Sequence, residues 1–240
     1  MMKYALVTGA TSGIGAEYAH QLAEAGHNII VVSNRDGENG IMAERLRREC
    51  GVQAEPLYAD LAQADAAEKI YAWCRARQAE VDILVSNAGI LHFGLLTRTD
   101  TAAIDRIVTL HCTTPAKLCR LFAADMCRRG EGRILLMSSI TAWTPYPTMS
   151  LYGSTKAFLR NFGAALYLET RRSGVSVTTV FPGAVDTPLY DLTPQRRRLL
   201  RRLGLMMSAR EVARRALRAM MNSRKSCTPG LAAKIETLLC

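Results

Sequence analysis

Three polar side chains in this chain are spaced for acid–base chemistry. Ser139 precedes Tyr152 by thirteen positions, and Lys156 follows the tyrosine by four. If this segment is helical, positions i and i+4 share one face, so the Tyr152 phenol and the Lys156 ammonium lie side by side. A nearby cation favours the phenolate and lowers a tyrosine pKa from its ordinary value of about 10. Such a phenol could exchange a proton with a substrate oxygen that the Ser139 hydroxyl also holds.

The Tyr–Lys pair alone is a weak signal, because a surface tyrosine over a lysine stem has the same spacing. A second motif strengthens it. The apolar run 4–7 predicts a buried strand, the glycine-rich turn TGATSGIG occupies 8–15, and a helical pattern runs from Ala16 to Gly26. Glycines let the backbone approach a pyrophosphate and helix N–H groups face it, which favours an anion site over a turn that binds nothing. Its residues would be Gly9, Thr11, Ser12, Gly13, Ile14 and Gly15.

Together these motifs resemble the short-chain dehydrogenase/reductase family. The turn has the spacing T-G-x-x-x-G-x-G and not the general G-x-G-x-x-G. The resemblance covers about residues 3–190, and the motifs follow in family order: the glycine-rich turn, Asp60, Asn87-Ala88-Gly89, Ser139, Tyr152-x-x-x-Lys156 and Pro182-Gly183-x-x-x-Thr187. It implies one Rossmann-type domain, a nicotinamide cofactor and hydride transfer between a ketone and an alcohol. Within the family the chain looks most like reductases of steroids or long-chain keto-lipids.

The resemblance also implies where the cofactor would lie. Asp60 would sit against the adenine, although a helix N-cap is the structural alternative for this residue. The Asn87-Ala88-Gly89 segment would form the wall behind the adenine ribose, Thr187 would lie near the nicotinamide carboxamide, and Lys156 would hold the nicotinamide ribose. The implied cofactor-binding positions are Asp60, Leu61, Asn87, Ala88, Gly89, Tyr152, Lys156, Pro182, Gly183, Val185 and Thr187.

The turn after the second expected strand bears on the choice between NADP and NAD. An acid there would hold the ribose diol of NAD, whereas an arginine would accept the 2′-phosphate of NADP. Asn34 stands where NADP-using family members often have arginine, and Arg35 stands beside it. No acid occupies 33 or 34, although Asp36 could blunt the charge of Arg35. We therefore expect Asn34 and Arg35 at the adenosine end and NADP(H) in preference to NAD(H); the alternative for Arg35 is a solvated turn residue.

The family chemistry assigns roles to the remaining residues. In the reductive direction, Tyr152 would protonate the carbonyl oxygen that Ser139 polarises; Ser138 is the competing serine, and the thirteen-position spacing favours Ser139. The family's usual fourth catalytic residue is an asparagine, thought to open its helix locally and hold a proton-relaying water. His111 stands at that position here. Because imidazole titrates near neutrality, His111 could serve the relay, or it could be a core histidine with no role.

The alternation of apolar runs with helical patterns predicts a doubly wound α/β fold, a parallel sheet with helices on both faces. A chain of 240 residues with a mean hydropathy of +0.02 suits one such domain, 1–240. We expect strands at 4–7, 28–33, 52–58, 83–86, 133–137 and 176–181. We expect helices at 16–25, 40–49, 64–79, 101–129, 151–172 and 209–222. The outer faces of the two longest helices need partners, and the family resemblance implies that they pack between subunits of a homodimer or homotetramer.

The composition of the chain bears on its cellular location and its partners. The N-terminus enters a strand directly, no apolar stretch approaches a membrane span, and seven scattered cysteines show no C-x-x-C, so a cytoplasmic protein without a structural metal is expected. The basic excess is local: residues 195–240 hold 12 Lys/Arg and 2 Glu, whereas 1–194 hold 19 of each sign. Arginines without interleaved aromatic residues disfavour nucleic acid as a partner.

The segment of about 188–207 is expected to be the substrate lid. Its apolar stripe, Leu199, Leu200, Leu203, Leu205 and Met206, is surrounded by Arg196, Arg197, Arg198, Arg201 and Arg202. The stripe could cover the active site, or residues 195–207 could contact an anionic membrane. Either role implies a hydrophobic substrate. The alternative to an oxidoreductase is a catalytically weak NADP(H)-sensing protein on the same fold.

Overall fold

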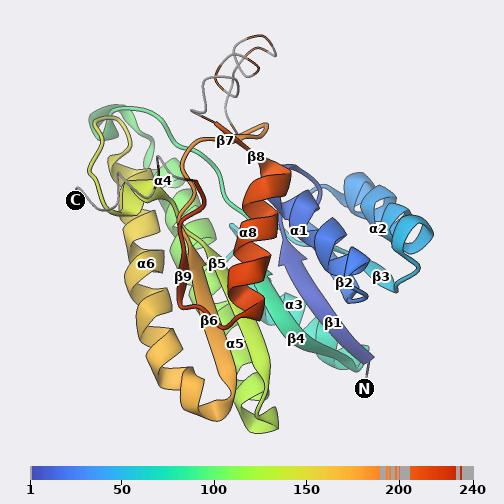
Figure 1. Cartoon of the computed structure of the whole chain (residues 1–240). Coiled ribbons are helices and arrows are strands. Elements are labelled where there is room, and N and C mark those ends of the chain that lie inside the picture. The colour runs from blue at the N-terminus through green and yellow to red at the C-terminus, as the bar shows by residue number, and fades with distance from the viewer. Residues whose placement is uncertain are drawn as a thin grey trace.

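A parallel β-sheet forms the centre of the computed structural model, which describes residues 2–189, 193, 195, 198, 200, 206–230 and 233. Within these residues the sheet has seven strands in the order β3-β2-β1-β4-β5-β6-β9 (Figure 1). The order reverses between β1 and β4, so the connections that follow these two strands lead to opposite faces of the sheet and leave a crevice at its C-terminal edge. The strands are β1 Met2–Thr8, β2 Asn28–Ser33, β3 Ala54–Tyr58, β4 Ala79–Ser86, β5 Gly132–Met137, β6 Val175–Val180 and β9 Ser226–Cys227.

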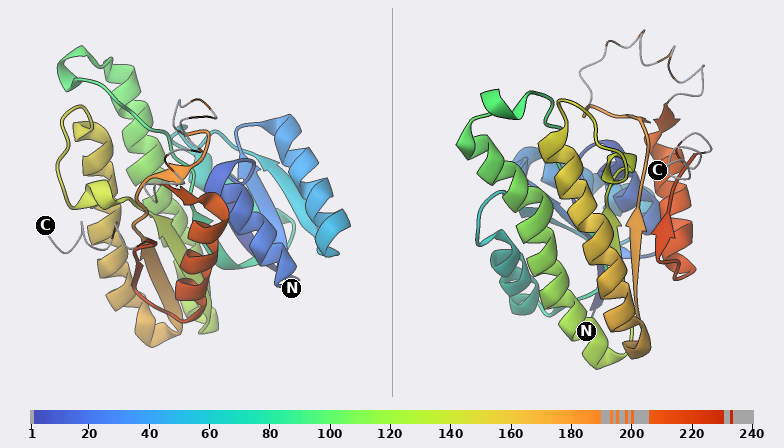
Figure 2. Two further views of the ribbon diagram at one scale, coloured as in Figure 1. Left: turned by 45° about the horizontal axis from the view of Figure 1, so that its top comes forward. Right: turned by 90° about the vertical axis from the view of Figure 1, so that its left-hand side faces the viewer.

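Helices cover both faces of the sheet, as Figure 2 shows for α5 and α6 on one side of β6 and α8 on the other. Side chains of β1 alternate between two cores: Leu6 packs with α3 and α5, whereas Ala5 and Val7 pack with α1, α2 and α8. This two-sided burial confirms the predicted doubly wound fold. The helices are α1 Gly13–Glu24, α2 Asp36–Cys50, α3 Ala66–Ala76, α4 Thr101–Val108, α5 Thr114–Arg129, α6 Ser150–Thr170 and α8 Ala209–Met221.

Several element boundaries differ from the sequence predictions, most clearly in two helices. The helix predicted over 101–129 is interrupted, because Thr109–Thr113 form a π-helical turn, η2, between α4 and α5. The helix predicted over 64–79 ends at Ala76, and Ala79 already belongs to β4. The chain reverses at Gln78, whose φ of 53° is left-handed. The short strand β9 was not predicted, since two residues carry no periodic pattern.

A two-stranded sheet lies beside the main one. Its strands β7 (Val185–Asp186) and β8 (Met207–Ser208) pair in parallel. Most of the predicted lid between them lies outside the described residues, as do Arg196, Arg197, Leu199, Arg201, Arg202, Leu203 and Leu205. Of the predicted stripe, Met206 is buried. The division into one domain with a lid stays a prediction. Among the described residues, no helix is long and apolar enough to cross a membrane.

Candidate active site

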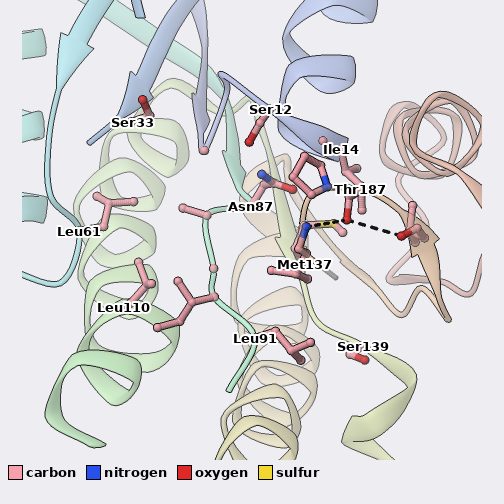
Figure 3. A pocket seen from close by; sticks show the side chains of 18 of the residues that line it. Ser12, Ile14, Ser33, Leu61, Asn87, Leu91, Leu110, Met137, Ser139 and Thr187 are labelled. Atoms are coloured by element: carbon pink, nitrogen blue, oxygen red, sulfur yellow. Dashed lines mark hydrogen bonds between the residues drawn. The ribbon is translucent and has the colours of Figure 1, made fainter. Parts of the chain in front are cut away.

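A cavity of about 540 Å³ opens at the C-terminal edge of the sheet, where the strand order reverses. It reaches from the turn after β2 to the loop after β5. Figure 3 shows Ser12, Asn87 and Thr187 between Ser33 toward one end and Ser139 at the other. The cavity is lined by these predicted residues: Gly9, Thr11, Ser12, Gly13, Ile14, Asn34, Arg35, Asp60, Leu61, Asn87, Ala88, Gly89, Ser139, Tyr152, Lys156, Pro182, Gly183, Val185 and Thr187. Gly15 and His111 are absent from this lining.

The glycine-rich turn owes its shape to the missing Cβ atoms. Gly9 and Gly13 have φ of 66° and 55°, which L-residues with side chains rarely adopt. A Cβ on Gly15 would lie 2.0 Å from the Gly9 carbonyl oxygen, so this residue permits the close packing of helix on turn. Ser12 precedes α1 in an extended conformation, and its side chain makes no cap hydrogen bond. The first N–H groups of α1 are therefore left without intrahelical partners at the cavity.

Thr8 joins the glycine-rich turn to the segment after β4. Its hydroxyl accepts hydrogen bonds from the backbone N–H groups of Asn87 (2.9 Å) and Ala88 (3.0 Å) and donates to the Val85 carbonyl (3.3 Å). The Asn87 side chain donates to the Thr8 carbonyl at 3.0 Å. The sequence analysis gave Thr8 no function, although a hydroxyl at the end of the first strand was the available signal.

A buried network shapes the turn after β2. The Asn39 side chain, fully buried, donates to the carbonyls of Ser33 (3.0 Å) and Leu57 (3.1 Å), and the Ser33 hydroxyl donates to Asn39 (2.6 Å). The Arg35 N–H donates to the Ser33 hydroxyl, which fixes where Arg35 leaves the sheet. The Arg35 guanidinium is 57% exposed and pairs with Glu38 at 3.1 Å. The acid beside this arginine is therefore Glu38 and not the expected Asp36.

Asp60 does not cap a helix, because α3 begins later and has Asp65 at its N-cap. One Asp60 oxygen accepts from the Ala62 N–H at 3.1 Å, and the other lies 3.7 Å from the Arg106 guanidinium. Arg106 lines the cavity but was not predicted, since it stands in the middle of an ordinary helical pattern. Ser138, which was weighed against Ser139, also lines the cavity, as do Pro188 and Leu189 of the predicted lid. The lining residues that had no predicted role are Ser33, Ala59, Ile90, Leu91, Leu110 and Met137.

The structure separates the two adjacent serines. Both are buried at the end of β5. The Ser138 hydroxyl donates to the Lys156 carbonyl at 2.7 Å, which ties α6 to the sheet. The Ser139 hydroxyl accepts from the Thr141 N–H at 3.2 Å, and this acceptor bond leaves its own hydrogen available at the cavity. The Ser138 hydroxyl hydrogen is thus used within the fold, and the catalytic role of Ser139 stays a prediction.

Tyr152 and Lys156 lie on one buried face of α6, as the four-residue spacing requires. The Lys156 ammonium is 5.4 Å from the centre of the Tyr152 ring and donates to the Met137 carbonyl at 2.9 Å. Burial lowers the pKa of Lys156 from 10.5 to about 8, and the nearby Cys112 offsets this slightly. A cation thus stands beside the phenol below this pH, where it favours the phenolate.

His111 lies inside the π-turn η2 and behind the cavity wall. Its Nε2 accepts from the Ile90 N–H at 3.0 Å, and its Nδ1 is 2.9 Å from the Thr155 hydroxyl. The ring meets the Tyr152 ring edge to face, with centres 5.8 Å apart. Burial, helped by the Lys156 ammonium, holds the pKa of His111 well below its usual 6.5. His111 thus stands where the helix predicted over 101–129 is locally widened by the π-turn.

The comparisons with known proteins agree with this geometry. The chain matches the family model described as short chain dehydrogenase over residues 3–197. It therefore belongs to the short-chain dehydrogenase/reductase family and is an oxidoreductase, and the expected resemblance is confirmed. It is similar to "Uncharacterized oxidoreductase YmfI" of Bacillus subtilis, at 36% identity over 192 residues, or 80% of this chain and 78% of that one.

The chain is also similar to a steroid dehydrogenase and to a solved structure. The 17-beta-hydroxysteroid dehydrogenase type 3 of Rattus norvegicus is 30% identical over 191 residues, 79% of this chain and 62% of that protein. The chain thus spans about three fifths of the length of this relative. The structure of a short-chain dehydrogenase from Sphingobium yanoikuyae in complex with NADPH has 32% identity and a TM-score of 0.86, covering 99% of this chain and 92% of that one.

Proposed function

We propose that the protein interconverts a ketone and a secondary alcohol with a nicotinamide dinucleotide, and that Tyr152 is the acid–base residue. One observation carries this: the glycine-rich turn and the buried Tyr152–Lys156 face open onto the same cavity. The turn suits a pyrophosphate, because its glycines leave the backbone bare and the N-terminus of α1 faces the cavity. When bound, the dinucleotide supplies or accepts the hydride.

The protein's own residues handle the oxygen and its proton. In reduction, Tyr152 gives its proton to the carbonyl oxygen, which the Ser139 hydroxyl also contacts. Lys156 stabilises the phenolate that remains, and its bond to Met137 and the anchoring of its carbonyl by Ser138 fix its position. In oxidation the same groups act in reverse. We infer that Lys156 also contacts the nicotinamide ribose when the cofactor is bound.

NADP(H) is our preferred cofactor over NAD(H). Arg35 lines the adenosine end of the cavity, and neither Ser33 nor Asn34 is an acid that would hold a ribose diol. The ion pair with Glu38 is exposed and weak, so a phosphate could displace it. The NADPH bound to the Sphingobium relative supports this preference. Arg106, beside Asp60, is a second cation at this end.

We propose a hydrophobic substrate. The reactive end of the cavity is lined by apolar Ile90, Leu91 and Leu189, and Phe93 and Leu96 are exposed in the loop that leads away from it. The hydroxysteroid named in the rat relative is a substrate of this kind. A long-chain keto-lipid would fit the same surface.

The oligomeric state and the cellular location of the protein are proposed from fewer observations. The outer face of α6 exposes Phe158, stacked on Phe162, and Leu168, and this supports a homodimer or homotetramer. A cytoplasmic protein, with peripheral contact to an anionic membrane through 195–207, is in keeping with the basic excess. Light scattering at several protein concentrations measures the oligomeric state. Pelleting with anionic liposomes at low salt measures the contact with the membrane.

The test of the cofactor proposal is a fluorescence titration of the purified protein with NADPH and NADH. We expect tighter binding of NADPH, and an Arg35→Ala variant should lose about tenfold for NADPH alone, the order of one charge-assisted hydrogen-bond set. Arg98→Ala, also exposed but outside the cavity lining, is the matched control. A preference for NADH, or an equal loss for both cofactors, would overturn the assignment of Arg35.

Turnover decides between the enzyme and the cofactor sensor. A panel of hydrophobic ketones is offered with NADPH, and loss of the reduced nicotinamide absorbance is followed. Reduction of at least one of them is the expected result. Tight NADPH binding without turnover of any ketone, or of the matching alcohols with NADP, would favour the sensor.

A further inference from the structure

A chain of hydrogen bonds behind the cavity connects the loop after β4 to the helix that carries Tyr152. The Ile90 N–H donates to Nε2 of His111 at 3.0 Å. Nδ1 of His111 lies 2.9 Å from the Thr155 hydroxyl, and that hydroxyl donates to the Tyr152 carbonyl at 2.8 Å. His111 and Thr155 are both buried, at 1% and 4% exposure, so bulk water does not compete for these bonds. Neither residue's part in this chain was foreseen from the sequence.

The directions of these bonds determine the state of the imidazole. A backbone N–H can only donate, so Nε2 must accept from Ile90 and carries no proton. The ring proton of the neutral form is then on Nδ1, and Nδ1–H donates to the Thr155 oxygen. The single hydrogen of Thr155 is left for the Tyr152 carbonyl. Each donor thus meets one acceptor along the chain, which is possible in only one tautomer.

A second proton on this ring would meet several obstacles. It would go to Nε2, which already faces the Ile90 N–H. The Lys156 ammonium from α6 adds to the cost. Tyr152, whose ring meets the imidazole edge to face, and Cys112 in the same π-turn are the other titratable groups nearby. The ring also lies against Gly89, where an added Cβ would be 3.0 Å from Nε2. Because Nε2 faces a backbone N–H, which neither accepts nor releases a proton, this imidazole offers no path for a proton from one ring nitrogen to the other side.

We propose that Thr155 and His111 are positioning residues that hold Tyr152 in place through this chain, and that the His111 side chain is not a proton carrier. Thr155 holds the first turn of α6 through its bond to the Tyr152 carbonyl. His111 connects Thr155 to the backbone of Ile90 at the cavity wall. The proposal deepens the proposed function, because its kinetic consequences depend on Tyr152 as the acid–base residue. The tautomer that it assigns to His111 does not depend on the role of Tyr152.

The first experiment replaces the Thr155 hydroxyl. Thr155→Val keeps the shape but leaves Nδ1–H and the Tyr152 carbonyl without this partner. We expect kcat to fall about 10- to 100-fold, the effect of a small misplacement of a reacting group, with NADPH affinity nearly unchanged. Thr155→Ser restores the hydroxyl and should recover kcat. The control is Thr170→Val, which removes a comparable buried hydroxyl at the far end of α6 and should not change kcat. Loss of kcat in the serine variant, or none in the valine variant, contradicts the proposal.

The second experiment separates positioning from proton transfer at His111. Glutamine can accept from Ile90 with its oxygen and donate to Thr155 with its nitrogen, but it does not titrate. His111→Gln should therefore retain much of kcat and the shape of the pH–kcat profile, whereas His111→Phe should lose kcat. If both variants lose kcat equally and the glutamine variant also loses a limb of the profile between about pH 5 and 8, the imidazole is a proton carrier and the proposal is wrong.

A third measurement does not depend on turnover. Long-range proton–nitrogen NMR spectra of protein labelled in its four histidines, with the His111 signals assigned from the His111→Gln variant, report which ring nitrogen bears the proton. We expect protonated Nδ1 and bare Nε2, unchanged on acidification for as long as the protein stays folded. A protonated Nε2 at neutral pH would refute the hydrogen-bond chain even if Tyr152 proves essential. The expected tautomer would stand even if no ketone were reduced.

Discussion

The two ends of the cavity are built in different ways. At the end formed by the glycine-rich turn, the shape comes from backbone that side chains would obstruct, as at Gly9, Gly13 and Gly15. At the other end it comes from side chains held by directed hydrogen bonds, as at Ser138 and Lys156. The first end should therefore be sensitive to added volume, and the second to lost hydrogen-bond donors and acceptors. Mutations at the first end should weaken binding of the cofactor, whereas mutations at the second end should slow turnover and leave that binding nearly unchanged.

The largest expected effect is on turnover at the second end. Tyr152→Phe removes the hydroxyl that exchanges the proton, so we expect turnover to fall about 10²- to 10⁴-fold, the usual contribution of a general acid. The dissociation constant for NADPH should change little, because the ring remains. Steady-state rates and fluorescence titration on the same preparation measure both.

A matched control is available on the same helix. Tyr167→Phe removes a half-buried hydroxyl far along α6 and should leave turnover intact. Turnover in the Tyr152→Phe variant close to that of the unaltered protein would remove Tyr152 from the chemistry. An equal loss of NADPH affinity and turnover would show that cofactor binding and turnover do not depend on different ends of the cavity.

At the first end the expected effect is on folding and binding together. In Gly15→Ala the new Cβ would lie 2.0 Å from the Gly9 carbonyl oxygen and 2.5 Å from the Asn87 amide, so the turn must shift. We expect a loss of about 1–3 kcal/mol in the free energy of unfolding and weaker NADPH binding. Urea unfolding and fluorescence titration are the measurements.

Gly40→Ala is the control for a glycine that supports no such packing. Gly40 lies within α2, and a Cβ there would meet nothing within 4 Å. The substitution should stabilise the protein by about 0.5–1 kcal/mol, because alanine loses less backbone freedom in a helix. If Gly15→Ala is as well tolerated as Gly40→Ala, the close packing of turn and helix is not what shapes this end.

The sequence predicted the two ends unequally. The glycine-rich turn could be recognised because backbone requirements appear directly in the sequence as glycines at fixed spacing. Of its six predicted binding residues, all but Gly15 line the cavity. The order of strands and helices followed from periodic burial, and the six predicted strands are all present. What the pattern could not show was the π-turn at Thr109–Thr113, because one extra residue in a helical turn leaves the apolar period almost unchanged.

Contacts between distant segments were also beyond the sequence. Thr8 binds the backbone of Asn87 and Ala88, and Thr155 meets His111 across two elements. Threonine is common in strands and helices, so only the fold shows which hydroxyl has a structural partner. The state of His111 was open for the same reason: imidazole serves as a proton carrier or as a fixed hydrogen-bonding group according to its neighbours.

The last expected effect is a pH dependence of stability that arises at the second end. Burial lowers the pKa of Lys156 from 10.5 to about 8 in the folded protein. Between these values the unfolded chain holds a proton that the folded protein has lost, so this group makes the free energy of unfolding rise with pH. Below about pH 8 the ammonium is charged in both states, and the full cost of burying it is present.

Lys156→Met tests this expectation, because methionine is also long and unbranched but never carries a charge. Without cofactor, the variant should be the more stable protein near neutral pH, and its advantage should shrink as the pH rises from about 8 toward 10.5. Urea unfolding of both proteins over this range measures the difference, in which the other titrating groups cancel. An advantage that grows with pH would mean that Lys156 gains stability from a buried anion, and the cation beside Tyr152 would then be held by a charge and not only by the Met137 carbonyl.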